Sequence, residues 1–67
     1  MEIKEINYII AMLKQKFCDF DHETADWIFD ILQNEEIEDA VIQISELECF
    51  NHFDKEVIQT KILNSLS

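Results

Sequence analysis

The chain contains no glycine and no proline among its 67 residues. Without glycine, no turn can depend on a residue at positive φ and no glycine-rich phosphate loop can form; without proline, there is no rigid linker. The connections must therefore be short and built from residues such as Asn and Asp, whose side chains favour turns. We expect compact helices joined by tight loops.

Length and composition indicate one small folded domain. Apolar residues make up 48% of the chain, too many for a disordered acidic tail. Residues 1–67 are expected to form a single interaction domain, a fragment of a longer protein. No stretch is long and apolar enough to span a membrane, and the acidic N-terminus does not resemble a signal peptide. We therefore expect an intracellular, non-secreted protein that does not bind membranes.

Apolar residues recur at helical spacing in the first half of the chain. The first predicted helix covers residues 3–16, and its apolar stripe is Ile3, Ile6, Ile9, Ile10, Leu13 and Phe17. The second begins near His22, after the capping residues Asp19 and Asp21, and ends near Gln33. Its inner face consists of Ala25, Ile28, Phe29 and Leu32, with Trp27 and Ile31 on the flank.

Two further helices are predicted in the second half. Asn34 is the expected N-cap of a helix over about 35–48, with an apolar stripe at Ile37, Ala40, Val41, Ile44 and Leu47. Asn51 or Asp54 is expected to cap the last helix, which carries Phe53, Val57, Ile58, Ile62 and Leu66. The predicted fold class is all-α, a compact four-helix bundle with a five-helix bundle as the alternative. Short connections place the loops at 18–21 and 49–53 at the same end.

Four potential zinc ligands lie on these two loops, namely Cys18, His22, Cys49 and His52. Zinc prefers four such ligands in a tetrahedron, but structural sites usually need Gly-rich turns that are absent here. Free cysteines, buried or half-buried, are the simpler interpretation. A Cys18–Cys49 disulfide is sterically feasible, although reducing compartments keep such thiols apart. We expect no metal and no other cofactor.

The formal net charge is -10, from fifteen Asp or Glu against five Lys. Such a surface repels phosphate backbones, so direct binding of nucleic acid is not expected. The acidic surface of interest comprises Asp26, Asp30, Glu35, Glu36, Glu38 and Asp39. Such residues usually form a solvated face; their functional interpretation is to steer a basic protein partner. A DNA-mimicking inhibitor of viral or phage type is the extreme form of this interpretation.

The polar residues do not assemble a recognisable catalytic set. The stretch DHETADW lacks the His-Glu-x-x-His pattern, and no nucleophile, base and orienting group can be matched. An enzyme is therefore not expected. Trp27 is more typical of the edge of a small core, with contact to a partner as the alternative.

Three stretches carry a family resemblance: ADWIFDIL at 25–32, IEDAVIQISEL at 37–47 and EVIQTKIL at 56–63. They resemble the PWI-like domain at the N-terminus of nuclear poly(A)-binding zinc-finger proteins, whose last helix carries a Val-Val-Gln-Thr run. The resemblance implies a nuclear docking module for export factors or nuclear-pore-associated proteins in mRNA processing and export, with RNA bound elsewhere. Ile62 and Leu63 match docking positions of that family, which are aromatic there. The expected partner contacts are therefore Trp27, Ile62 and Leu63.

A rival resemblance is to the ubiquitin-binding CUE domain. It rests on LKQKFCDFD followed by an apolar helix and EEIEDAVIQISEL. Cys18 stands where that family has the proline of its Met-Phe-Pro motif, and Ile44 and Ser45 stand where it has a Leu-Leu pair. Ubiquitin binding is therefore the alternative implied by resemblance, and homodimerisation through leftover apolar surface also stays open.

Overall fold

The structure, a computed structural model, describes residues 1–66, and this range is helical without any strand. Its elements are α1 (Ile3–Lys16), α2 (His22–Asn34), α3 (Ile37–Ser45), the single 3₁₀ turn η1 (Glu48–Phe50) and α4 (Lys55–Asn64). The predicted all-α bundle of four helices is thus confirmed. No helix in this range is long and apolar enough to span a membrane.

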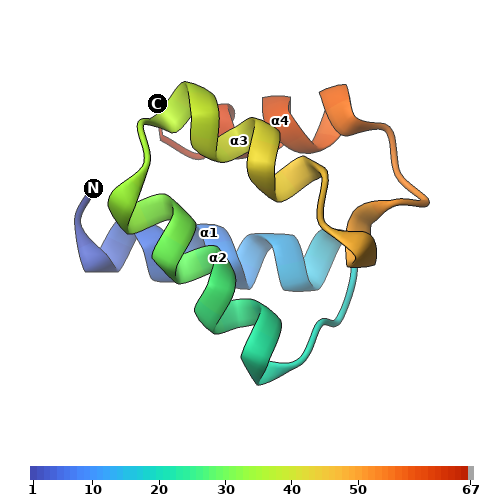
Figure 1. Ribbon diagram of the computed structural model, residues 1–67, viewed down its shortest axis with the longest axis horizontal. Coiled ribbons are helices and arrows are strands. Elements are labelled where there is room, and N and C mark those ends of the chain that lie inside the picture. Colours follow the sequence, from blue (N-terminus) through green and yellow to red (C-terminus); the bar gives the residue numbers. More distant parts are fainter. Residues whose placement is uncertain (67) are drawn as a thin grey trace.

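The four helices form two layers (Figure 1). Helices α1 and α2 pack together in one layer, α3 and α4 pack together in the other, and α2 also contacts α3. The loop after α1 and the turn η1 lie at the same end, as predicted. The ring of Phe50 in η1 lies 6.2 Å from that of Phe17 and 5.9 Å from that of Phe20, both edge-to-face.

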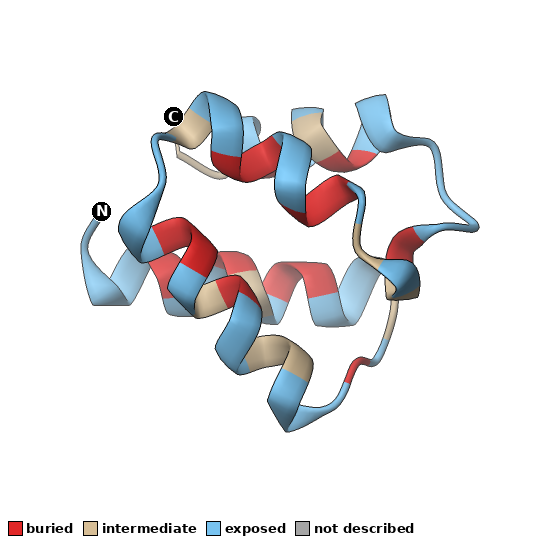
Figure 2. Cartoon of the chain, in the orientation of Figure 1, coloured by how far each residue is buried: buried red, intermediate tan, exposed pale blue. Residues whose placement is uncertain are grey.

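The core lies between the two layers, where the helix faces are buried (Figure 2). Its buried apolar members are Ile6, Ile9, Met12, Leu13, Phe20, Ile28, Ile31, Leu32, Ala40, Val41, Ile44, Phe50, Ile58 and Ile62. Most of them follow the predicted stripes. Ile31 is buried rather than on the flank, because α2 packs against both α1 and α3.

Local polar contacts explain where the helices start. Asp21 accepts a hydrogen bond from the Thr24 backbone N–H at 2.9 Å, and Asp54 accepts one from the Glu56 backbone N–H at 2.9 Å. Each satisfies an amide that the helix leaves without a partner. Asp54, rather than Asn51, is therefore the cap of α4.

The third helix is shorter than predicted, and its predicted cap is wrong. Asn34 is the last residue of α2, where its Nδ2 donates a hydrogen bond to Asp30 Oδ1 at 3.0 Å. This contact favours one more helical residue in α2, so the link to α3 falls at Glu35 and Glu36. Glu36 is the N-cap of α3 and has extended backbone angles.

Three residues of the predicted stripes are exposed. They are Ile3, Phe53 and Val57, which lie in the first turn of α1, in the loop after η1 and in the first turn of α4. Apolar spacing alone therefore overestimates the buried face.

Candidate functional site

The four potential zinc ligands do not come together as one set. Cys18 and Cys49 are neighbours and both are free and half-buried. His22 is exposed and lies beside Asp26, with Nε2 3.6 Å from Oδ2, and His52 is exposed. Within residues 1–66, no group of three or more His, Cys, Asp or Glu side chains has an arrangement that could hold a metal ion.

The structure separates the two predicted contact residues of α4. Ile62 has 0% of its surface exposed and belongs to the core, so it cannot contact a partner, and that prediction is corrected. The cause is its position one turn after Ile58 on the face that packs inward. Leu63, the next residue, is 44% exposed and remains available.

Trp27 is the most exposed large apolar residue among those described, with 63% of its surface accessible. It lies on the outer side of α2, next to a shallow hollow of about 260 Å³ that it lines together with Asp21, Glu23 and Thr24. The expectation that Trp27 packs at the edge of the core is therefore wrong, and its indole is accessible to a partner.

A polar contact fixes how α3 and α4 lie against each other. Gln59 Nε2 donates a hydrogen bond to Ser45 Oγ at 3.0 Å, and the Ser45 hydroxyl donates to the Ile42 carbonyl at 2.8 Å. Ser45 is fully buried and is the one buried polar residue in the described range. The hydrogen bond therefore places Ser45 of α3 opposite Gln59 of α4.

This register brings a second exposed aliphatic residue next to Leu63. Helices α3 and α4 run in opposite directions (Figure 1). The residue one turn before Ser45 in α3 therefore lies opposite the residue one turn after Gln59 in α4. Those positions are Ile42, which is 47% exposed, and Leu63. We call this pair, Ile42 and Leu63, the α3–α4 patch.

The sequence pattern does not identify Ile42 as a contact residue, because Ile42 lies off the apolar stripe of α3. Only the pairing of α3 with α4 brings it beside Leu63, and spacing within one helix carries no information on that pairing. The short connection between the two helices predicts that they are antiparallel. Which residues of α3 lie opposite which residues of α4 depends on the contact between Ser45 and Gln59.

The α3–α4 patch has acidic neighbours. Glu38 in α3 and Glu46 at its C-cap lie one turn before and one turn after Ile42, and both are exposed. Glu46 forms a long ion pair with Lys55, with Oε2 3.9 Å from Nζ. The predicted acidic surface is also solvent-exposed at all its positions, namely Asp26, Asp30, Glu35, Glu36, Glu38 and Asp39.

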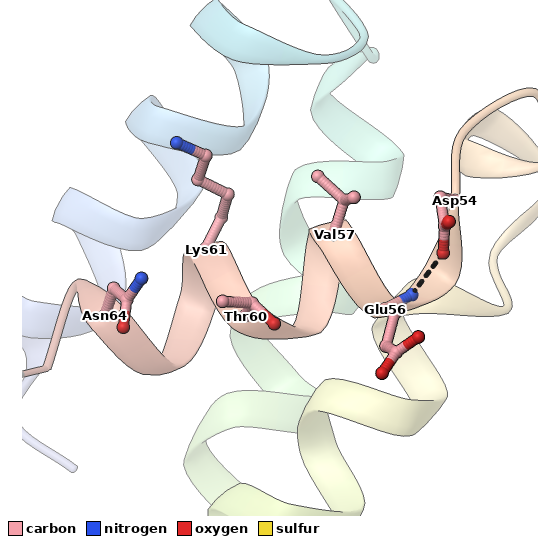
Figure 3. Close-up of a pocket in the computed structure, with 6 residues that line it drawn as sticks. All are labelled: Asp54, Glu56, Val57, Thr60, Lys61 and Asn64. Atoms are coloured by element: carbon pink, nitrogen blue, oxygen red, sulfur yellow. Dashed lines mark hydrogen bonds between the residues drawn. The ribbon is translucent and has the colours of Figure 1, made fainter.

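Another hollow lies elsewhere on α4 and has a volume of about 370 Å³. Its lining residues, Asp54, Glu56, Val57, Thr60, Lys61 and Asn64, all belong to α4 or its cap (Figure 3). One convex helix supplies every wall, so the hollow cannot enclose a small molecule as ligand pockets do. Val57 in this hollow is 46% exposed, which makes it a matched control for Leu63.

The positions that match the CUE contact are unavailable. Ile44 and Ser45 both have no exposed surface, because both lie on the inward side of α3. A ubiquitin contact of the CUE kind through these two residues is therefore excluded by their burial.

No family model, no curated protein and no solved structure matches this chain. The site must accordingly be interpreted from its own geometry, in which an aliphatic pair and a tryptophan lie exposed on a strongly acidic domain.

Proposed function

We propose that the chain is a non-enzymatic protein–protein interaction domain that binds a basic, amphipathic segment of a partner through the α3–α4 patch. The observation that carries the proposal is the exposure of Ile42 and Leu63, which the register set by Ser45 and Gln59 places opposite each other across the packed pair α3–α4. Single exposed aliphatic residues are common, whereas adjoining ones with a charged rim are typical of interaction sites.

The size of the patch indicates a weak, transient contact. Complete burial of an Ile or Leu side chain stabilises by roughly 1.5–3 kcal/mol, and about half of each side chain is already covered. Burying the pair therefore contributes on the order of 2 kcal/mol, a factor of about 30 in affinity. Trp27 on α2 supplies a second anchor for a longer partner.

The charge selects the partner. Glu38 and Glu46 border the patch, and the whole chain has a net charge of -10. Lys and Arg on the polar face of a partner helix would lie beside these carboxylates, while its apolar face covers Ile42 and Leu63. Opposite charges also accelerate the encounter, an effect that salt screens.

A narrower proposal comes from the resemblance to the PWI-like domain. It assigns the domain to nuclear mRNA processing and export, with an export factor or a nuclear-pore-associated protein as partner. Its support is the three matching stretches in α2, α3 and α4, together with the exposure of Leu63 at a docking position of that family. A nuclear location is part of this proposal.

The proposal is tested by comparing Leu63→Asp with Val57→Asp. Both residues lie on α4 and are about equally exposed, so both variants should retain the helical circular dichroism of the native chain. The probe is a Lys-rich helical peptide of about 18 residues with Leu on one face. We expect Leu63→Asp to lower its affinity at least tenfold, and Val57→Asp to change it less than twofold. Equal losses in the two variants would contradict the proposal.

Capture from a nuclear extract tests the narrower proposal with the same two variants. Export or nuclear-pore-associated proteins should bind the native chain and Val57→Asp but not Leu63→Asp. Capture of a nucleic-acid enzyme that depends on salt but not on Leu63 would instead support a DNA mimic. Concentration-dependent sedimentation that Leu63→Asp abolishes would show that a second copy covers the patch.

A further inference from the structure

Two cysteines that are far apart in the sequence meet at one end of the bundle. Cys18 follows α1 and Cys49 lies in η1, and the two thiols are near enough to influence each other electrostatically. Their sequence neighbours support this placement, since the rings of Phe17 and Phe50 are in edge-to-face contact at 6.2 Å. Both cysteines are half-buried, so reagents in solution can reach them.

The surrounding rings hold the two segments in place. Phe50 is fully buried and also contacts Phe20, with ring centroids 5.9 Å apart, and Phe17 contacts Phe53 at 5.2 Å. Aromatic contacts therefore flank Cys18 on both sides along the chain and directly follow Cys49. The thiols are brought together by the packing of the core and not by a flexible loop.

We propose that Cys18 and Cys49 form a dithiol modification site that reacts with low-molecular-weight disulfides, such as oxidised glutathione, to give an internal disulfide. The site is independent of the proposed protein-binding function. It would covalently join the loop between α1 and α2 to the turn between α3 and α4, and hence one helical layer to the other.

The reaction proceeds in two exchange steps. The Cys18 thiolate attacks one sulfur of oxidised glutathione, forms a mixed disulfide and releases the first glutathione as a thiolate. Cys49 then loses its proton to solvent, attacks the Cys18 sulfur and releases the second glutathione. The two cysteines give up two protons and two electrons, and the glutathione disulfide is reduced to two glutathione thiols.

The order of the steps follows from the electrostatics of the pair. Partial burial raises the pKa of the Cys49 thiol to about 11, and the nearby charge and hydrogen bond of Cys18 and the charge of Asp21 add to this effect. Cys49 therefore stays protonated at neutral pH, and Cys18 is the first nucleophile. Once Cys18 is in a mixed disulfide, its sulfur lies beside Cys49, which acts as the resolving thiol after losing its proton.

The test is to equilibrate the full chain with mixtures of reduced and oxidised glutathione and to follow the products by mass spectrometry. We expect a monomer that has lost two hydrogen atoms. Because the fold holds the thiols together, the equilibrium constant for forming the internal disulfide should be at least about tenfold larger in the native chain than in the chain unfolded by urea. The thermal midpoint of the oxidised chain should then rise by roughly 5 °C or more.

The variants Cys18→Ser and Cys49→Ser serve as controls, with circular dichroism to confirm their folding. Each should give one mixed disulfide with glutathione, and Cys18→Ser should react more slowly because only the high-pKa thiol remains. Two mixed disulfides on the native chain, a disulfide-linked dimer or an equal constant in urea would each overturn the proposal.

Discussion

Ile62 and Leu63 are adjacent in the sequence but lie in opposite environments. Ile62 is enclosed by the core, whereas Leu63 faces solvent beside Ile42. The energetic roles of the two residues should therefore separate cleanly. Ile62 stabilises the fold, and Leu63 is free to contact a partner at little cost to stability.

Truncation of these two neighbours tests the assignment. Ile62→Ala should lower the free energy of unfolding by roughly 2–4 kcal/mol, because it removes buried methylene groups and leaves a cavity. Leu63→Ala should lower it by less than about 1 kcal/mol. Urea denaturation followed by circular dichroism measures both. Comparable losses would mean that Leu63 belongs to the core.

At the level of single elements, the caps decide where helices begin. Asp21 illustrates the electrostatics, because the Thr24 backbone N–H, and then its hydroxyl, lower the pKa of the Asp21 carboxyl from its ordinary value of 3.8. The unfolded chain lacks this contact, so the folded state binds protons less readily. The stabilisation is complete above the ordinary pKa and disappears as the pH falls through the lowered one.

Asp21→Asn should therefore change the acid part of the stability curve. The native chain is expected to lose stability below about pH 4, and part of that loss should be missing in the variant, since Asn does not titrate. Urea midpoints between about pH 2.5 and 6 give the comparison. The charge contribution of the other carboxylates is common to both chains and cancels. Identical slopes would show that the cap does not act through its charge.

The elements also show which parts of the fold follow from sequence. Helix α1 was predicted with the bounds it has, because its apolar spacing and flanking residues agree. The start of α3 was predicted wrongly. Asn34 fits two roles in the sequence, as the N-cap of the next helix or as a last-turn residue of α2 that hydrogen-bonds to Asp30. The choice between them depends on how α2 and α3 pack, which local spacing does not contain.

For the whole molecule, charge and size act together. The net charge of -10 lies on a chain of only 67 residues. The burial of a small core must therefore offset the electrostatic repulsion among the carboxylates. Salt screens that repulsion, so raising NaCl from about 0.02 M to 0.5 M should raise the urea midpoint. The same change should weaken binding of a Lys-rich peptide. A lower midpoint at high salt would contradict the view that like charges destabilise the fold.

The site was predictable only in part. The acidic surface and the exposure of Leu63 follow from composition and helical periodicity, because they are properties of one helix face. The partnership of Leu63 with Ile42, and the meeting of Cys18 with Cys49, depend on contacts between elements. Burial of Ile62, by contrast, agrees with its place in the predicted apolar stripe of the last helix, and only the family resemblance made it a partner contact. The two pairings between elements are different. Such facts come from tertiary structure alone.

The central claim is that the α3–α4 patch is the binding surface, and an amide-resolved NMR titration tests it most directly. The labelled chain is titrated with the Lys-rich amphipathic peptide at low salt. We predict the largest shifts at Ile42, Leu63 and Glu46, with Val57 and Lys61 on the other side of α4 unchanged. Shifts centred on Val57 and Lys61, or spread evenly over all acidic residues, would contradict the account.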